Sequence, residues 1–260
     1  KRNRYVILDG QRRWMCAKAL QLLTVPVNQV DEPSLVQNIV TMFQIHKLRE
    51  DWELMPTALK LEVLMEELKE RNDKRLAALT GLDQAVVQRC KKLLNYPKKY
   101  QDRMLEPDPS VRVKADFFIE LYAVRNDRFV NGLEWYSKDR FTRAMLDRYL
   151  NGQLRAVTDF RVIKQHINNA RKAGKEGQIS RRLMEFTESP ELGIDHLQVA
   201  GAAAAAEATT LTRQVDRIAS DMQALDVNEL IGEEQLWEAI ENLASIIQKK
   251  LREAGRRIKR

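Results

Sequence analysis

Residues 73–92, DKRLAALTGLDQAVVQRCKK, have the pattern of a helix-turn-helix motif. Such a motif needs a small residue where its two helices touch, a glycine that can adopt the left-handed conformation in the turn, and apolar residues that hold the second helix against the first. Ala77, Gly81 and Val87 occupy these three places. The other apolar positions of the motif are Leu76, Leu82 and Cys90. We therefore predict two short helices joined by a turn at Gly81.

The second helix of this motif is predicted to present a polar and basic surface. Asp83 suits its N-cap position. The residues expected to point outward are Gln84, Ala85, Gln88, Arg89, Lys91 and Lys92, and the segment that follows adds Lys98, Lys99 and Arg103. Glutamine and arginine pair with the edges of adenine and guanine, and lysine suits phosphate, so the pattern favours double-stranded DNA as the partner. The alternative is an ordinary helical hairpin with a basic face.

The chain around the motif is predicted to be predominantly α-helical. Pro56 suits the first position of a helix whose apolar face is formed by Leu61, Leu64, Met65 and Leu68. The aromatic residues of ADFFIELY, residues 115–122, recur at helical spacing, which favours a place in the core over base stacking. We interpret residues 55–170 as one helical domain that contains the helix-turn-helix.

A second group of basic residues follows within that domain. It consists of Arg140, Arg143, Arg148, Arg155, Arg161 and Lys164. These side chains are expected to form either a second phosphate-contacting surface or a solvated helix face.

The C-terminal part of the chain is predicted to be a linker followed by two helices. Residues 170–182 combine charge with two glycines and no apolar periodicity, so we interpret residues 171–200 as a linker. Residues 201–260 carry two apolar stripes, Leu211, Val215, Ile218, Met222 and Leu225, then Leu236, Ile240, Leu243 and Ile247. The stripes can pair as a helical hairpin or as a coiled coil between two chains. We favour a homodimer, because a helix-turn-helix protein that binds paired half-sites needs two copies.

The N-terminal residues 1–54 are predicted to form a small α/β unit. The run YVIL, residues 5–8, is typical of a buried strand, and Asp9 with Gly10 indicates a turn. A helix follows, and residues 24–27 are typical of a second short strand before another helix from about Leu35. The chain opens directly on the first strand, so we expect the domain to include a segment upstream of residue 1.

Two adjacent arginines lie in the first turn of the first predicted helix. Unpaired N–H groups and the positive end of the helix dipole favour an anion there, so Arg12 and Arg13 indicate a phosphate or carboxylate ligand. The alternatives are a solvated pair of charges or a bridge to Asp9.

Composition limits the classes of function. The formal net charge is +7, which favours polyanionic partners. Cys16 and Cys90 are predicted to be buried thiols, which indicates a reducing compartment without a disulfide framework. No run is long and apolar enough to span a membrane, and no apolar segment follows the basic start. We therefore expect a cytoplasmic protein with no membrane partner.

Together, the arginine corner and the helix-turn-helix resemble the ParB/RepB/Noc family of partition proteins over about residues 5–105. The family pattern Gly-Glu-Arg-Arg-x-Arg-Ala is similar to GQRRWMCA, in which Gln11 replaces the glutamate and Met15 the later arginine. The next family pattern, Glu-Asn-x-x-Arg, is similar to QNIVT, in which Gln37 and Thr41 replace the two charged residues. LAALTGL, residues 76–82, resembles the family's helix-turn-helix.

This resemblance implies a partial ParB/sulfiredoxin-like fold and a nucleotide-gated DNA clamp. CTP, or another nucleoside triphosphate, would bind with Mg2+ to Gly10, Gln11, Arg12, Arg13, Gln37 and Asn38, and Asn38 would help to orient the metal. The family's upstream segment contacts the base, so these residues alone are expected to form an incomplete pocket. The family also implies a prokaryotic, nucleoid-associated protein with a partition ATPase as a possible partner.

The substitutions in the second pattern imply weak or absent CTP hydrolysis. Gln37 cannot act as a general base, and Thr41 cannot stabilise charge as arginine does. One alternative is a nucleotide hydrolase or ParB-like nuclease on the same fold. A metal-dependent nuclease needs clustered carboxylates, and the N-terminal unit offers Asp9, Asp31 and Glu32. The other alternative is a transcription regulator with the same helix-turn-helix.

Overall fold

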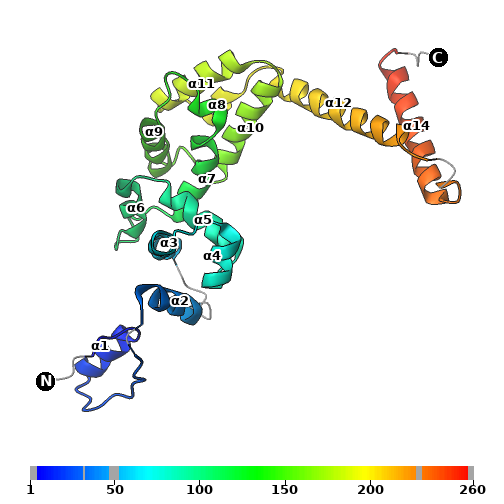
Figure 1. Cartoon of the computed structure of the whole chain (residues 1–260). Coiled ribbons are helices and arrows are strands. Elements are labelled where there is room, and N and C mark those ends of the chain that lie inside the picture. The colour runs from blue at the N-terminus through cyan, green and yellow to red at the C-terminus, as the bar shows by residue number, and fades with distance from the viewer. Residues whose placement is uncertain (1–4, 32, 47–52, 227–229, 257–260) are drawn as a thin grey trace. The chain divides into compact units, whose positions relative to one another are not determined.

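The computed structural model describes residues 5–31, 33–46, 53–226 and 230–256, and their regular elements are all helices (Figure 1). The N-terminal half contains α1 (Gln11–Ala19), α2 (Leu35–His46), α3 (Leu54–Leu68), α4 (Asp73–Thr80), α5 (Gln84–Leu94), α6 (Lys98–Leu105), α7 (Ala115–Arg125) and α8 (Arg128–Asn131). These are followed by α9 (Lys138–Leu150), α10 (Asp159–Lys172), α11 (Glu176–Glu188), the 3-10 helix η1 (Ile194–Leu197), α12 (Ala202–Gln223) and α14 (Glu234–Glu253). The predominantly α-helical fold predicted from the sequence is confirmed.

The chain divides into two compact units. The first unit comprises residues 1–168 and 176–198, and the second comprises residues 169–175 and 199–260. The first unit therefore contains both the N-terminal region and the helix-turn-helix, which the sequence had suggested to be separate domains.

The predicted N-terminal α/β unit is not present in the described residues. Residues 5–8 and 24–27 are irregular segments rather than strands, and their side chains are exposed, Val6 to 83% and Val27 to 78%. A strand is stable only when a neighbouring strand takes up its backbone hydrogen bonds and a packed layer covers its apolar face. Among the described residues these two segments exchange no backbone hydrogen bond, so their β-branched composition alone does not produce a sheet.

The core of the first unit is built on α3. Its Ala58, Leu61 and Leu64 are fully buried, and α5 packs along it. Helix α2 packs on α3 and α4 through Ile39 and Phe43, which are 6% and 1% exposed. The N-terminal region is thus joined to the helix-turn-helix by a shared apolar core.

Helix α7 supplies the aromatic part of this core. Phe117 and Phe118 are fully buried, as predicted from their spacing. The Phe118 ring meets the Tyr96 ring edge to face with 5.0 Å between centroids, and Phe117 meets Phe160 of α10 at 5.3 Å. These contacts fix α7 between the end of α5 and α10.

The segment 171–200, predicted as a linker, instead contains α11 and η1. Ile179, Leu183 and Phe186 are fully buried and recur at helical spacing. Leu183 and Phe186 lie beyond residues 170–182, the charged and glycine-containing stretch on which the linker prediction was based. Gly174, with φ +66°, follows the end of α10, and α11 begins two residues later. The apolar face of α11 is therefore part of the first unit's core.

The second unit contains α12 and α14. Ala202 and Ala206 are buried, but Leu211, Val215 and Ile218 of the first predicted stripe are 54%, 56% and 43% exposed. No described residue of α14 is buried. The homodimer predicted from these stripes stays a prediction.

No helix in the described part of the chain combines the length and apolar character that crossing a membrane requires.

Candidate DNA-binding surface

The turn between α4 and α5 has the geometry predicted from the sequence. Gly81 adopts φ +73° and its N–H donates to the carbonyl of Ala77 over 2.8 Å, which ends α4. At the other end of α4, the Asn72 side chain accepts a hydrogen bond from the backbone N–H of Arg75. The left-handed turn redirects the chain within three residues, so that α5 packs across α4.

Helix α5 is held in place by its apolar face. Val87, Cys90 and Leu93 are fully buried, as is Leu76 of α4. Burial raises the pKa of the Cys90 thiol to about 12, so this side chain is a neutral, packed group. Cys16, also predicted to be buried, is exposed on α1.

Asp83 is the N-cap of α5, but through its backbone. Its carbonyl accepts hydrogen bonds from Val86 and Val87 N–H, at 2.9 and 3.1 Å, while its side chain makes no capping bond. The predicted side-chain cap is therefore not formed, and the Asp83 carboxylate is exposed beside the first turn of α5.

The outward face of α5 is polar. Gln84, Ala85 and Gln88 are exposed, and the two glutamines lie one helical turn apart. Arg89, Lys91 and Lys92 are partly exposed along the flanks of the helix. This places all six predicted DNA-contacting residues of α5 within reach of solvent.

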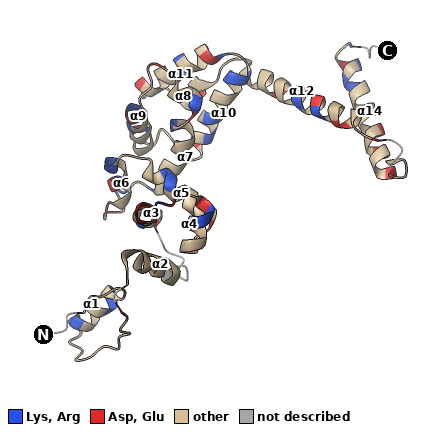
Figure 2. Cartoon of the chain, viewed as in Figure 1, with Lys and Arg blue, Asp and Glu red and all other residues tan. Residues whose placement is uncertain are grey.

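Most of the predicted DNA-contacting cations near α5 are engaged in ion pairs within the chain. Arg89 contacts Asp116 of α7 at 2.6 Å, and Lys91 contacts Asp73 of α4 at 2.6 Å. In α6, Lys99 contacts Asp139 of α9 at 2.5 Å. In Figure 2 the charged residues of α5 are all basic, whereas α4 carries both acidic and basic residues.

Three cations on this surface form no ion pair with a carboxylate within the described residues. The Lys92 ammonium lies 5.9 Å from the centre of the Tyr122 ring, Lys98 is exposed at the first position of α6, and Arg103 is exposed in the last turn of the same helix. These are the side chains most directly available to a phosphate.

The carboxylates that pair with these cations were not predicted from the sequence. Hydrogen bonding to Lys91 lowers the pKa of Asp73, and hydrogen bonding to Lys99 lowers the pKa of Asp139. Both therefore stay ionised at neutral pH and neutralise part of the basic surface. Their partners lie far away in the sequence, so no local pattern could have identified them.

The second basic group predicted from the sequence does not form one surface. Arg148 is buried and donates to the carbonyls of Ser189 and Leu192 at 2.6 and 2.8 Å after α11, and burial lowers its pKa. Lys164 is paired with the buried Asp127. Arg143 shares Asp139 with Lys99. Of the remaining members, Arg140 pairs with Glu188, Arg161 pairs with Glu120, and Arg155 is exposed.

The predicted nucleotide-binding residues lie at the first turns of two helices. Gly10 precedes α1 with φ +88°, Gln11 and Arg12 are exposed, and Arg13 forms a salt bridge with Asp9 at 3.3 Å. The bridge to Asp9 is one of the alternatives considered from the sequence.

The residues from α2 are used in a helix cap. Gln37 accepts a hydrogen bond from Ser34 N–H at 2.9 Å, and its own N–H donates to the Ser34 hydroxyl at 3.2 Å. Asn38 is partly buried. Within the described residues no hydrogen bond or ion pair links this cap to Gly10, Arg12 or Arg13. As they lie, these side chains do not form a triphosphate pocket.

In the part of the chain that the structure describes, His, Cys, Asp and Glu side chains do not form a metal site. No group of three or more His, Cys, Asp or Glu residues lies close enough to hold an ion. Asp9 is paired with Arg13, and Glu32 lies outside the described residues. Metal binding through Asn38 stays a prediction.

Comparison of this chain with protein-family models, with curated proteins and with solved structures found no match.

Proposed function

We propose that this chain is a sequence-specific DNA-binding protein of the partition type, which contacts base pairs through α5. The observation that carries the proposal is the left-handed turn at Gly81, which fixes α5 on α4 with Gln84 and Gln88 exposed one turn apart. Glutamine can donate to and accept from adenine in the major groove, so two glutamines at this spacing can contact neighbouring base pairs.

The charges around α5 support a role in phosphate contact. Lys92 of α5 and Lys98 at the first position of α6 form no ion pair with a described carboxylate. Ion pairs between exposed side chains contribute little to stability, so phosphate oxygens can replace the carboxylates on Arg89 and Lys99. Release of counterions from DNA favours this exchange.

The partition-type assignment rests on the arginine corner and the helix-turn-helix in their order along the chain. It includes a homodimer formed through the apolar stripes of α12 and α14, a nucleoid-associated location and a partition ATPase as partner. It also includes binding of CTP or another nucleoside triphosphate at Arg12 and Arg13, with weak or no hydrolysis. Nucleotide binding would require Arg13 to leave Asp9 and the α1 and α2 turns to converge.

The test is selection of duplexes from a random pool by the full chain, followed by footprinting of the enriched sequence with and without CTP, ATP or GTP. We expect one enriched motif, and a footprint that spreads beyond it when the right nucleotide is present. A transcription regulator with the same helix-turn-helix would give a footprint confined to the motif.

The matched variants are Gln84→Ala with Gln88→Ala, and Gln178→Ala as the control. Gln178 is exposed in the first turn of α11, as Gln84 is in α5. The double variant should lose the enriched motif while the control keeps it. Enrichment that is absent in the parent, or identical in the double variant, contradicts the proposed function. Arg12→Ala should abolish any nucleotide dependence without changing the motif.

A further inference from the structure

Two carboxylates hold cations that belong to α5, α6 and α9. Asp116, in the first turn of α7, contacts the Arg89 guanidinium at 2.6 Å. Asp139, in the first turn of α9, contacts Lys99 at 2.5 Å through one oxygen and Arg143 at 2.9 Å through the other. Three basic side chains, one each from α5, α6 and α9, are thus neutralised by two acids.

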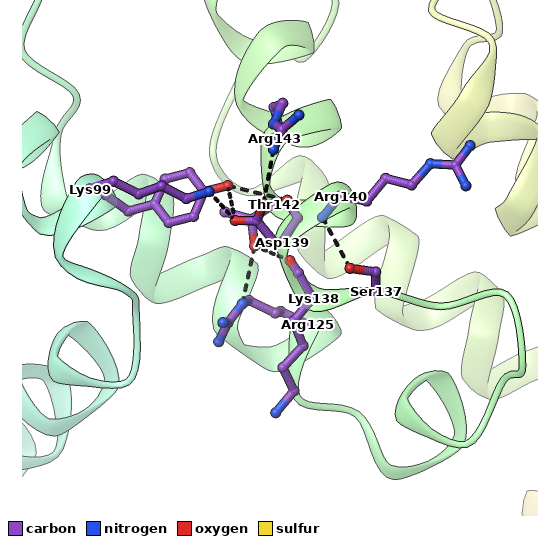
Figure 3. Close-up of polar contacts among 9 residues, drawn as sticks. Lys99, Arg125, Ser137, Lys138, Asp139, Arg140, Thr142 and Arg143 are labelled. Atoms are coloured by element: carbon purple, nitrogen blue, oxygen red, sulfur yellow. Dashed lines mark hydrogen bonds and ion pairs between the residues drawn. The ribbon is translucent and has the colours of Figure 1, made fainter.

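The surroundings of Asp139 form a compact set of hydrogen-bond donors (Figure 3). Lys99 and Arg143 approach its carboxylate from different sides, whereas the Arg140 guanidinium points away from it. The Tyr100 hydroxyl donates to the same carboxylate over 2.9 Å. Burial, followed by the neighbouring Asp139, raises the pKa of Tyr100 to about 12, so this hydroxyl keeps its proton at neutral pH.

An ammonium, a guanidinium and a hydroxyl are also the groups that proteins use to bind DNA phosphates. Asp139 accepts from all three in the way that a phosphate oxygen would. The cations remain accessible, because the side chains of Lys99, Arg143 and Arg89 are 53%, 64% and 42% exposed. Exposed ion pairs of this kind contribute little to folding, so their loss does not require the helices to move apart.

We propose that Asp139 and Asp116 compete with DNA phosphates for Lys99, Arg143 and Arg89, and so weaken binding to DNA of arbitrary sequence. The inference rests on the proposed function and adds residues that set the affinity for DNA. On arbitrary DNA only phosphate contacts contribute, so the cost of breaking the internal pairs offsets much of the binding free energy. On the cognate site the same cost applies, but the base contacts of α5 add to the binding energy and outweigh it.

Removal of the carboxylates has the opposite effect on DNA binding if they position the cations for a phosphate without competing with it. In that case removal weakens binding. The competition proposed here requires that removal strengthens binding to both duplexes.

The test compares Asp139→Asn and Asp116→Asn with the control Asp147→Asn. Asp147 is exposed on α9, so the control makes the same change of net charge on the same helix. Dissociation constants are measured for a random-sequence duplex and for the enriched site over a series of salt concentrations, with the full chain.

We expect Asp139→Asn to tighten binding to the random duplex severalfold more than the control does. Each cation that gains a phosphate should steepen the dependence of log K on log salt by about 0.9. Affinity for the enriched site should rise by a similar factor, because the same internal pairs are broken on both duplexes. Lys99→Ala in the Asp139→Asn background should reverse part of the gain.

Equal affinities for Asp139→Asn and Asp147→Asn, or weaker binding by Asp139→Asn, would overturn the inference while leaving the proposed function intact. A parent chain that binds neither duplex would overturn both. Circular dichroism melts check that each variant folds. Asp116→Asn alters a different helix, and it tests through Arg89 whether a paired carboxylate weakens DNA binding.

Discussion

The hydroxyl of Tyr96 donates a 2.7 Å hydrogen bond to the backbone carbonyl of Phe118, which links the end of α5 to the middle of α7. Tyr96 is almost fully buried, and the Arg125 guanidinium lies 4.4 Å from the centre of its ring. This relationship fixes the C-terminal end of α5 against the aromatic core.

Replacing Tyr96 by phenylalanine should lower the free energy of unfolding by about 1 kcal/mol, because it removes one buried hydrogen bond but keeps the ring. Urea denaturation of the parent and the variant measures this difference. Tyr122→Phe is the control, since Tyr122 is only partly buried on α7, the helix that Tyr96 contacts, and it should change stability less. Equal stability of Tyr96→Phe and the parent would show that water replaces the lost bond.

Gly81→Ala should destabilise the first unit by about 1–2 kcal/mol, because an alanine at φ +73° adopts a left-handed conformation that L-residues disfavour. Gly177→Ala is the matched control with the opposite sign. Gly177 lies inside α11 with open space around its Cα, so alanine there should stabilise by up to about 1 kcal/mol. Chemical denaturation measures the free energy of unfolding of both variants. Changes of opposite sign indicate strain at the turn, whereas changes of the same sign indicate a general effect of alanine.

Gln88→Ala and Lys98→Ala should weaken DNA binding in different ways. Loss of a base contact should reduce discrimination between the enriched site and random DNA by about 1–3 kcal/mol. Loss of the exposed lysine should weaken both alike and reduce the salt dependence by about one unit of slope. Fluorescence anisotropy over a salt series separates the two effects, and the same profile for both variants would contradict the assignment of roles.

Arg148→Met should lower the free energy of unfolding by about 2–4 kcal/mol. The guanidinium is buried and donates to the carbonyls of Phe186, Ser189, Pro190 and Leu192, which would all lose their partner. Arg155→Met, at an exposed position, should stay within about 0.5 kcal/mol of the parent. Urea denaturation measures both, and a similar small effect for the two variants would refute the structural role of Arg148.

Val215→Glu should convert a dimer to a monomer if the stripe on α12 forms the interface. Val215 is 56% exposed, so within one chain the change costs little, but it would bury a charge between two chains. Gln223→Glu makes an acidic residue on another side of the same helix and should leave the dimer intact. Sedimentation velocity distinguishes the cases, and a monomeric parent would contradict the homodimer.

The features that the sequence predicted well are those determined by neighbouring residues. The turn at Gly81 and the buried positions Leu76, Val87 and Cys90 follow from local conformational preference and helical spacing. The exposed face of α5 follows from the same spacing.

The features that it did not predict depend on contacts between distant segments. A strand at residues 5–8 would need a partner that composition cannot supply, and the structure has none for it among the described residues. The pairing of Asp116 with Arg89, and of Asp139 with Lys99, arises only when α7 and α9 pack beside α5 and α6. The helix at 176–188 was missed because its apolar residues extend beyond the charged stretch that suggested a linker.

The burial of Phe43 and Ile39 between α2, α3 and α4 has a consequence for motion on the timescale of hydrogen exchange. Neither residue can be released without opening the apolar core that also supports the helix-turn-helix. Amide protons of α2 should therefore exchange together with those of α4, through a shared opening, and not through independent fraying of the N-terminal region. A ligand that restrains α2 would slow exchange in α4 as well, and so would transmit its binding to the helix on which α5 rests.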